Sequence, residues 1–306
     1  MPGRRHLAVL VALLLAGTGT AVAVAPLLPP QTTFQALELP APVAKEGVDR
    51  RLWGLSVRTW GDDVPFPERE PAVFIAARDV DPTTQRVRSV AIVVRNARPS
   101  GWLGGPGASA KIDVLREKAI VAATKLLDDP KAQESGTDGK STLDALAQAL
   151  PGEPRDGERR VVAVLALRSE WPALDRALAY SLTESIVKAK AADVLDLDSA
   201  ERLLAEYGIA PASEGAVDPP LAAWAQALGV DAVAGVRATS VRAVTSADDG
   251  ADLLSTEVLW SRADGGIDRD TTSLRVPHRT YPARGKLGTV PQIVLRQADD
   301  LSAEMI

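Results

Sequence analysis

The fold is decided by a stretch that begins with the apolar run Val161-Val162-Ala163-Val164-Leu165-Ala166-Leu167. Charged residues stand on both sides of this run, which is typical of a short strand that is buried on both faces. In the segment that follows, an apolar residue recurs at every fourth position: Leu174, Leu178, Leu182 and Ile186. This spacing places the four side chains on one face and predicts a helix of about five turns.

A second strand and a second helix are expected directly after this helix. Residues 193–196 predict a short strand. Asp198 and Glu201 have the spacing of a capping box, in which the acidic N-cap accepts N–H groups of the first turn and the glutamate reaches back. Gly208 is expected to end the helix, because glycine readily adopts the left-handed conformation that follows helix C-termini.

The next helix is predicted between Asp218 and Gly229. Asp218 is the expected N-cap, Pro219 and Pro220 suit a first turn that needs no N–H donors, and Gly229 is expected to end the helix with a positive φ. Residues 231–236 predict a third strand. The order strand, helix, strand, helix, helix, strand indicates an α/β or α+β fold, with a mixed sheet and flanking helices.

The composition fits a globular protein of about two domains. The chain has 306 residues, of which 46% are hydrophobic, and a formal net charge of -5. Its arginines are scattered and its net charge is acidic, which argues against binding to nucleic acid. The sequence contains no cysteine, which excludes disulfides, thiolate nucleophiles and zinc–thiolate sites.

Residues 1–28 have the pattern of a targeting signal. Arg4 and Arg5 precede an uncharged segment that ends in small residues, as in an export signal. The segment is also long enough to span a bilayer, so a cleaved signal peptide and a retained membrane anchor both stay open. Either alternative predicts a periplasmic or otherwise extracytoplasmic protein. Residues 29–43 are proline-rich and lack periodicity, which predicts a tether.

A small antiparallel β-rich domain is predicted for residues 44–150. Runs of β-branched and aromatic residues, separated by turn-forming residues, predict three or four antiparallel strands within residues 47–98. Apolar residues with helical spacing predict a helix over 109–127, and a shorter helix is expected over 143–150.

The second domain is predicted to span residues 159–306, after a linker of proline, glycine and charged residues at 151–158. Two Asp-Gly turns, at 248–250 and 264–266, predict hairpins that join the last three strands. Residues 291–304 have helical spacing and predict a final helix.

The strand, turn and strand pattern of residues 74–87 resembles one unit of the LptC/OstA-type lipopolysaccharide-transport fold. The resemblance extends over residues 47–98. Members of that family often lie behind a single membrane anchor, so the resemblance implies an envelope protein whose first domain handles lipid.

Three segments of the second domain carry another resemblance: residues 161–167, 194–208 and 224–235. They resemble the amino-terminal domain of TolB and the periplasmic domain of CsgG over residues 159–305. The resemblance implies a mixed sheet with flanking helices and a role in protein binding. Members of this family share no catalytic residues, and this chain lacks both the propeller repeats of TolB and the acylated cysteine of CsgG.

Candidate catalytic and metal sites are few. Ser185 and Lys188 match the Ser-x-x-Lys motif of penicillin-binding enzymes. Ile186 lies on the apolar ridge, however, so both residues are interpreted as flanks of an amphipathic helix. His6 lies in the predicted targeting segment and His278 stands alone. Neither a catalytic triad nor a histidine-rich metal site can therefore be assembled. The paired aspartates lack EF-hand spacing and fit turns. We therefore expect no enzyme, no cofactor and no metal.

The sequence thus predicts a non-enzymatic protein of the bacterial cell envelope that binds another protein or assists assembly. The alternative is a lipid-handling or transport accessory, which requires an apolar groove lined by Trp53, Trp60 and Phe74. An envelope hydrolase is the third reading.

Two partner-binding surfaces are predicted. One is the loop between the two short helices, which carries Ile209, Pro211 and Val217 on a rigid scaffold. The other is the last strand, which contains Ser273 and is expected to be a sheet edge open to pairing with another chain.

Overall fold

The computed structural model describes these residues of the chain: 31–60, 71–96, 108–129, 159–210, 218–241, 252–263, 265 and 267–275. The predicted export segment, the linker and the helices predicted over 143–150 and 291–304 lie outside them. None of the described helices is both long enough and apolar enough to cross a membrane.

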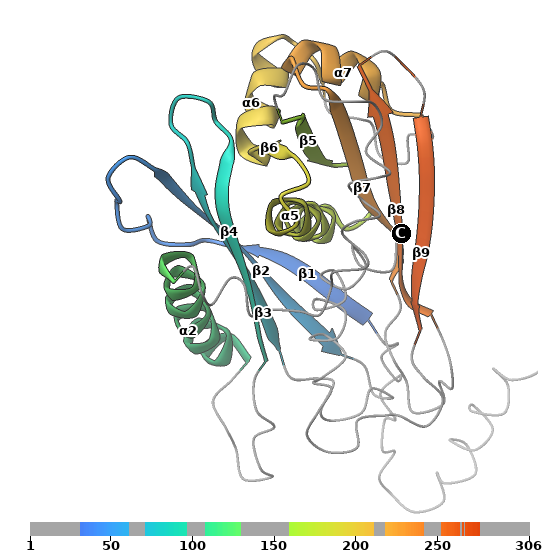
Figure 1. The fold of residues 1–306 in the computed structure, drawn as a ribbon. Coiled ribbons are helices and arrows are strands. Elements are labelled where there is room, and N and C mark those ends of the chain that lie inside the picture. The colour runs from blue at the N-terminus through green and yellow to red at the C-terminus, as the bar shows by residue number, and fades with distance from the viewer. Residues whose placement is uncertain are drawn as a thin grey trace, which may run out of the picture.

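The first part of the chain forms a four-stranded antiparallel sheet with the order β1-β2-β3-β4 (Figure 1). Its strands and the helix against it are β1 (Gln31–Leu37), β2 (Asp49–Trp60), β3 (Ala72–Val80), β4 (Val87–Asn96) and α2 (Ala108–Asp128). The predicted meander is confirmed, as is the helix. The predicted tether is wrong over Gln31–Leu37, because this segment pairs along its whole length with β2.

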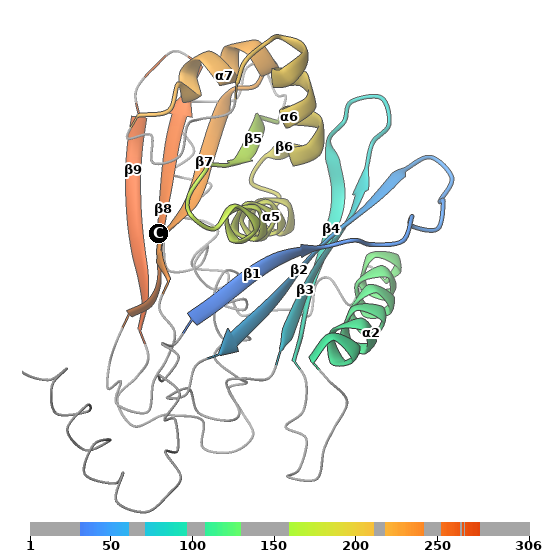
Figure 2. The ribbon, with the colours of Figure 1, turned by 180° about the vertical axis from the view of Figure 1, so that it is seen from behind.

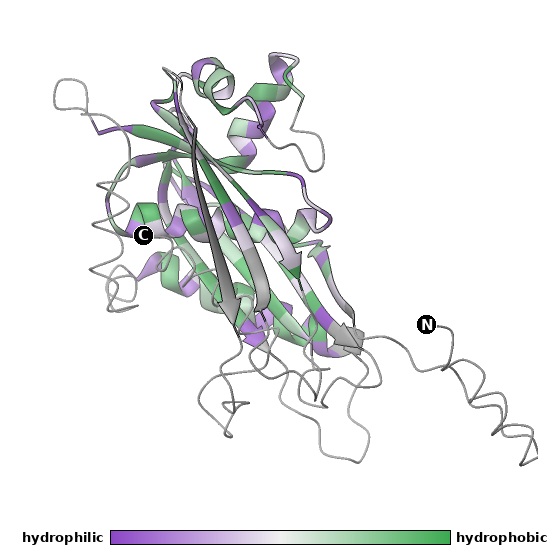
Figure 3. Cartoon of the chain, turned by 90° about the vertical axis from the view of Figure 1, so that its right-hand side faces the viewer, coloured by the Kyte–Doolittle hydropathy of each residue, from purple (hydrophilic) through white to green (hydrophobic). Residues whose placement is uncertain are grey.

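β3 is buried on both faces because the sheet is covered on both sides. Phe74 and Ala76 face the larger core cluster, whereas Val73 and Ile75 face a second cluster with α2. Successive side chains of a strand point to opposite faces, so a fully apolar run such as that of β3 requires two covering layers. Figure 3 shows apolar and polar residues interspersed along the strands and helices.

The second part of the chain forms a five-stranded mixed sheet with the order β6-β5-β7-β8-β9. Its strands are β5 (Val161–Ala166), β6 (Asp193–Leu195), β7 (Ala232–Val241), β8 (Asp252–Arg262) and β9 (Ile267–Arg275). β5 is parallel to β6 and β7, and the other pairs are antiparallel. The helices α6 (Leu197–Glu206) and α7 (Leu221–Leu228) pack against this sheet (Figure 2). The predicted order of elements is confirmed from β5 to β9.

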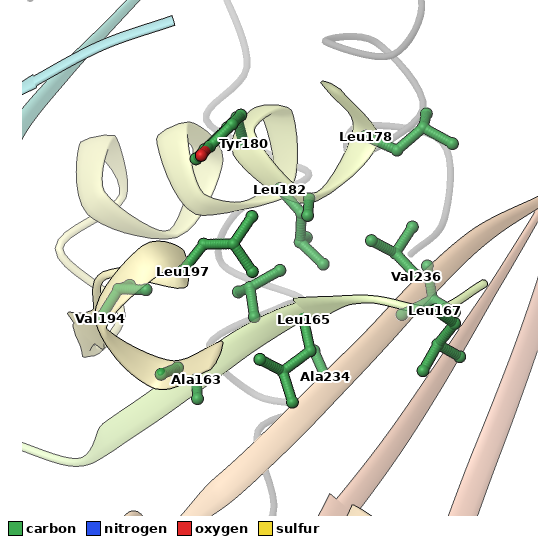
Figure 4. Packing of buried hydrophobic residues seen from close by; sticks show 14 of the residues in the cluster. Ala163, Leu165, Leu167, Leu178, Tyr180, Leu182, Val194, Leu197, Ala234 and Val236 are labelled. Atoms are coloured by element: carbon green, nitrogen blue, oxygen red, sulfur yellow. The ribbon is translucent and has the colours of Figure 1, made fainter. Parts of the chain in front are cut away.

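The long helix α5 (Pro172–Lys188) lies between the two sheets (Figures 1 and 2). Leu182 points from α5 toward the five-stranded sheet, whereas Tyr180 lies on the other side of the helix (Figure 4). Residues of both sheets belong to the same core cluster as α5. The two parts predicted as separate domains therefore share one core.

Two predicted helix caps are wrong. The N-cap of α6 is Asp196, whose carboxylate accepts a hydrogen bond from the Ser199 N–H, and Asp198 lies inside the first turn. The N-cap of α7 is Pro220, without a side-chain cap from Asp218. Both predicted ends are confirmed, because Gly208 and Gly229 have positive φ values of 69° and 65°.

The Gly229→Val substitution is expected to lower the free energy of unfolding by more than about 1 kcal/mol, because a β-branched residue is strained in the left-handed region. A Cβ at this position would meet nothing within 4 Å, so the cost comes from the backbone alone. Denaturant melts measure the loss. Gly229→Asn is the control and should cost less, since asparagine tolerates this conformation. Equal losses for both variants would contradict the explanation.

Candidate functional site: a buried polar junction and an open strand edge

The two sheets meet at one edge, where the start of β4 lies beside the end of β6. Arg86 and Leu195 form an antiparallel bridge. The Asp196 N–H donates to the Gln85 carbonyl over 3.0 Å. Gln85 ends the β3–β4 turn with a positive φ of 57°, and its side-chain oxygen accepts hydrogen bonds from Arg51 and Ser199. One hairpin turn thus joins the first sheet to the start of α6.

Arg78 is the central side chain of this junction. It extends from β3, is 0% exposed, and lies with its Nε 3.0 Å from Asp196 and its Nη2 2.7 Å from Asp198. Its guanidinium carbon is 4.1 Å from the centre of the Tyr180 ring. A buried arginine is stable only when it is paired, so its carboxylates and the aromatic ring explain how β3 carries a charge into the core.

Arg176 of α5 binds the same acidic helix start from the other side. It forms ion pairs with Asp198 and Glu201. The Tyr180 hydroxyl donates to Asp198 over 3.1 Å. Burial raises the pKa of Tyr180 to about 12. Burial would also raise the pKa of Asp198, but Arg78 and Arg176 hold it below the usual value, so this carboxylate stays charged.

This junction positions structural elements and offers no obvious chemistry. Its arginines are held by carboxylates, and its tyrosine keeps its proton. Among the described residues, no group of three or more His, Asp or Glu side chains has the geometry to hold a metal ion. We therefore interpret the junction as the contact that fixes β3, α5 and α6 relative to one another.

The residues of the Ser-x-x-Lys motif serve the helix in which they lie. The Ser185 hydroxyl donates to the Ser181 carbonyl over 3.1 Å. Lys188 forms an ion pair of 2.8 Å with Glu184, which also accepts the N–H of Ile92 from β4. Both side chains contribute to the packing of α5.

The three residues predicted to line an apolar groove do not do so together. Phe74 is 0% exposed and belongs to the core. Trp53 is half-buried and packs against Phe74 and Tyr180, with ring centres 6.0 and 5.3 Å apart. The side chain of Trp60 lies outside the described part of the structure. The space beside Trp53 and Phe74 is thus occupied by α5.

The predicted partner-binding residues fall in two places. Ile209 is partly buried and packs against the core, and its N–H donates to the Leu204 carbonyl after the end of α6. Pro211 and Val217 lie outside the described residues. Ser273 is placed on β9 and pairs with Ser255 of β8.

β9 is the terminal strand of the five-stranded sheet. Among the strands that the structure describes, it has β8 as its neighbour on one side and none on the other. An edge strand presents backbone N–H and C=O groups that a further strand can pair with. The structure thus describes the backbone of the predicted edge, whereas Pro211 and Val217 of the predicted loop lie outside the described residues.

Sequence reasoning missed Arg78 and Asp175. Asp175 lies in the first turn of α5 and is 0% exposed. A charged residue at the end of the apolar run Ala72-Val73-Phe74-Ile75-Ala76-Ala77 was the available signal for Arg78, and no comparable signal marks Asp175.

Comparisons with protein-family models, with curated proteins and with solved structures found no match. The resemblances to TolB, to CsgG and to the LptC/OstA-type fold stay predictions.

Proposed function

We propose that this chain is a non-enzymatic protein-binding module of the bacterial cell envelope, which captures an extended segment of a partner protein along the edge of β9 that no described strand covers. The position of β9 at the end of its sheet carries the proposal. An extended peptide can add a strand to such an edge, because its backbone satisfies the unpaired N–H and C=O groups. The extracytoplasmic location rests on the N-terminal sequence.

The packing of α5 favours protein binding over the two alternatives. Phe74 and Trp53 are used in the contact between the first sheet and α5, which disfavours a lipid groove lined by these two residues. Ser185 and Lys188 are engaged within α5, which disfavours a nucleophilic role for this motif. The polar junction fixes β3, α5 and α6 relative to one another, and β9 lies at the other end of the five-stranded sheet from β6.

Crosslinking in cells tests which surface meets the partner. A photo-crosslinking residue is placed at Ser273, at Ile209 and, as a control, at Val121 on α2, which is 69% exposed. We expect adducts with one protein from Ser273 and none of that protein from Val121. Adducts from Ile209 alone would favour the loop after α6, and adducts from neither Ser273 nor Ile209 would contradict the protein-binding proposal.

Two neighbouring proline substitutions test the backbone pairing directly. In an antiparallel strand, successive N–H groups point alternately to the two sides of the strand. One of the variants Thr272→Pro and Ser273→Pro therefore removes a hydrogen bond to β8. The other removes an N–H on the side of β9 that no described strand covers. The first variant should lose stability in a denaturant melt. The second should fold normally but bind the crosslinked partner at least about tenfold more weakly. Unchanged binding by the variant that folds normally would argue against strand addition.

A further inference from the structure

A fully buried carboxylate joins the start of α5 to β7. One oxygen of Asp175 accepts hydrogen bonds from the Ala238 N–H, at 2.7 Å, and from the Ser169 hydroxyl, at 2.9 Å. The other oxygen accepts the Ser169 N–H at 2.9 Å. All three donors are neutral, and Asp175 forms no ion pair with any residue that the structure describes. A buried charge of this kind is unusual, because buried charges are normally paired.

Asp175 takes the place of a strand carbonyl. The ladder between β5 and β7 ends with Ala166 beside Val236, and the Leu167 N–H still donates to the Val236 carbonyl over 2.8 Å. In a continued parallel ladder, the Ala238 N–H would bond to the Leu167 carbonyl. It donates to Asp175 instead, at the point where the register of β7 with β8 shifts. The carboxylate thus pins an irregular point of β7 to the helix.

The neighbouring cations already have acidic partners. Arg237 of β7 acts electrostatically on Asp175, but its guanidinium forms an ion pair of 2.6 Å with Glu257 of β8. Arg176, the next residue of α5, pairs with Asp198 and Glu201. The loop before α5 supplies Ser169, which is neutral, and the charged residues on either side of it, Arg168 and Glu170, are exposed. The charge on Asp175 is therefore only weakly compensated.

We propose that Asp175 is a proton-responsive clasp, which holds the irregular outer end of β7 against the start of α5 more tightly when its carboxyl group is neutral than when it is charged. Complete burial without a paired cation favours the neutral form, and the Ser169 hydroxyl, which also accepts the Trp171 N–H, can accept the carboxyl hydrogen. This inference does not depend on the proposed partner.

The electrostatics agree with the geometry. Burial raises the pKa of Asp175 to about 6, although the bonds from Ala238 and Ser169 and the charge of Arg237 act in the opposite direction. In the closed state the Ala238 N–H is bonded to Asp175, and in the open state this bond is broken. A carboxyl group whose pKa is higher in the closed state than in the open state stabilises the closed state at low pH. That contribution is complete below the ordinary pKa of 3.8 and is lost as the pH rises through about 6.

Hydrogen exchange of the Ala238 amide in the full chain tests the clasp. Rates are measured from about pH 4.5 to about pH 7.5 and corrected for the intrinsic pH dependence of exchange. The equilibrium constant for opening should rise with pH, by at most about a hundredfold, and level off above about pH 6. Asp175→Asn should abolish this dependence. Asp193→Asn is the matched control, because Asp193 is an acid of β6 outside the clasp, and should keep the wild-type profile.

Direct titration of the Asp175 carboxyl keeps the inference testable if Asp175→Asn does not fold. Carbon NMR of the unaltered chain should show this carboxyl titrating near pH 6. A midpoint below about pH 4.5, near that of an ordinary aspartate, would overturn the inference. So would an Ala238 protection that is independent of pH, or one that falls on acidification in the unaltered chain.

Discussion

Replacing Arg78 by Met is expected to lower the free energy of unfolding by about 3 kcal/mol. Removing one partner of a buried ion pair costs about 3–5 kcal/mol, because the remaining charge is left buried and uncompensated. We expect the lower end of this range, since Asp196 keeps its ion pair with Arg51 and Asp198 keeps that with Arg176. Methionine retains the length of the side chain, so the loss reports chiefly on charge.

The matched control for this substitution is Arg202→Met. Arg202 forms an exposed pair with Glu206 at 3.8 Å on α6, and exposed pairs contribute about 0–1 kcal/mol. If Arg78→Met and Arg202→Met give equal losses in denaturant melts, the junction does not hold the fold together.

Replacing Leu182 by Ala should lower the free energy of unfolding by about 2–5 kcal/mol, and replacing Leu178 should do the same. Both side chains are 3% exposed and belong to the core cluster that α5 shares with the two sheets, and Leu182 points toward the five-stranded sheet in Figure 4. The cost combines lost apolar contact with a cavity that the two surrounding sheets cannot easily close. The control is Val121→Ala on the exposed face of α2, expected within about 0.5 kcal/mol. Losses of that size for both leucines would mean that α5 is not buried as described.

Local patterns predicted the elements well. The ridge of Leu174, Leu178, Leu182 and Ile186 gave the correct helix, and the glycines at 208 and 229 gave the correct helix ends. These signals are carried by neighbouring residues and need no knowledge of the rest of the chain. The same holds for the Asp-Gly turn at 264–266, which separates β8 from β9.

Features that depend on distant residues were not predictable. Residues 31–37 were predicted to be part of a tether, because their polar and apolar residues follow no strand pattern. They form the strand β1 because they pair with β2. Asp198 was predicted as the N-cap of α6, although its actual role is set by Arg78 and Arg176.

The second buried face of α5 was also missed. Glu184 on that face is buried, and it accepts the Ile92 N–H and pairs with Lys188. A pattern of apolar residues cannot reveal a polar side chain whose partners come from another strand. For the same reason, the shared core appeared in the sequence as two separate domains.

The ion pairs between the first sheet and the start of α6 have a consequence for the order in which the protein folds. Arg51 and Asp196 are 145 positions apart, and Arg78 and Asp198 are 120 positions apart. Contacts between such distant residues form slowly, because a long loop must close before these contacts can stabilise the fold. During synthesis, the first sheet emerges well before α5, and until α5 arrives its Phe74 face lacks the helix that covers it. We therefore expect a late, cooperative step in which α5 and α6 dock onto the first sheet after it has formed. Before that step the apolar Phe74 face of the sheet is exposed, and misfolding is expected to begin there.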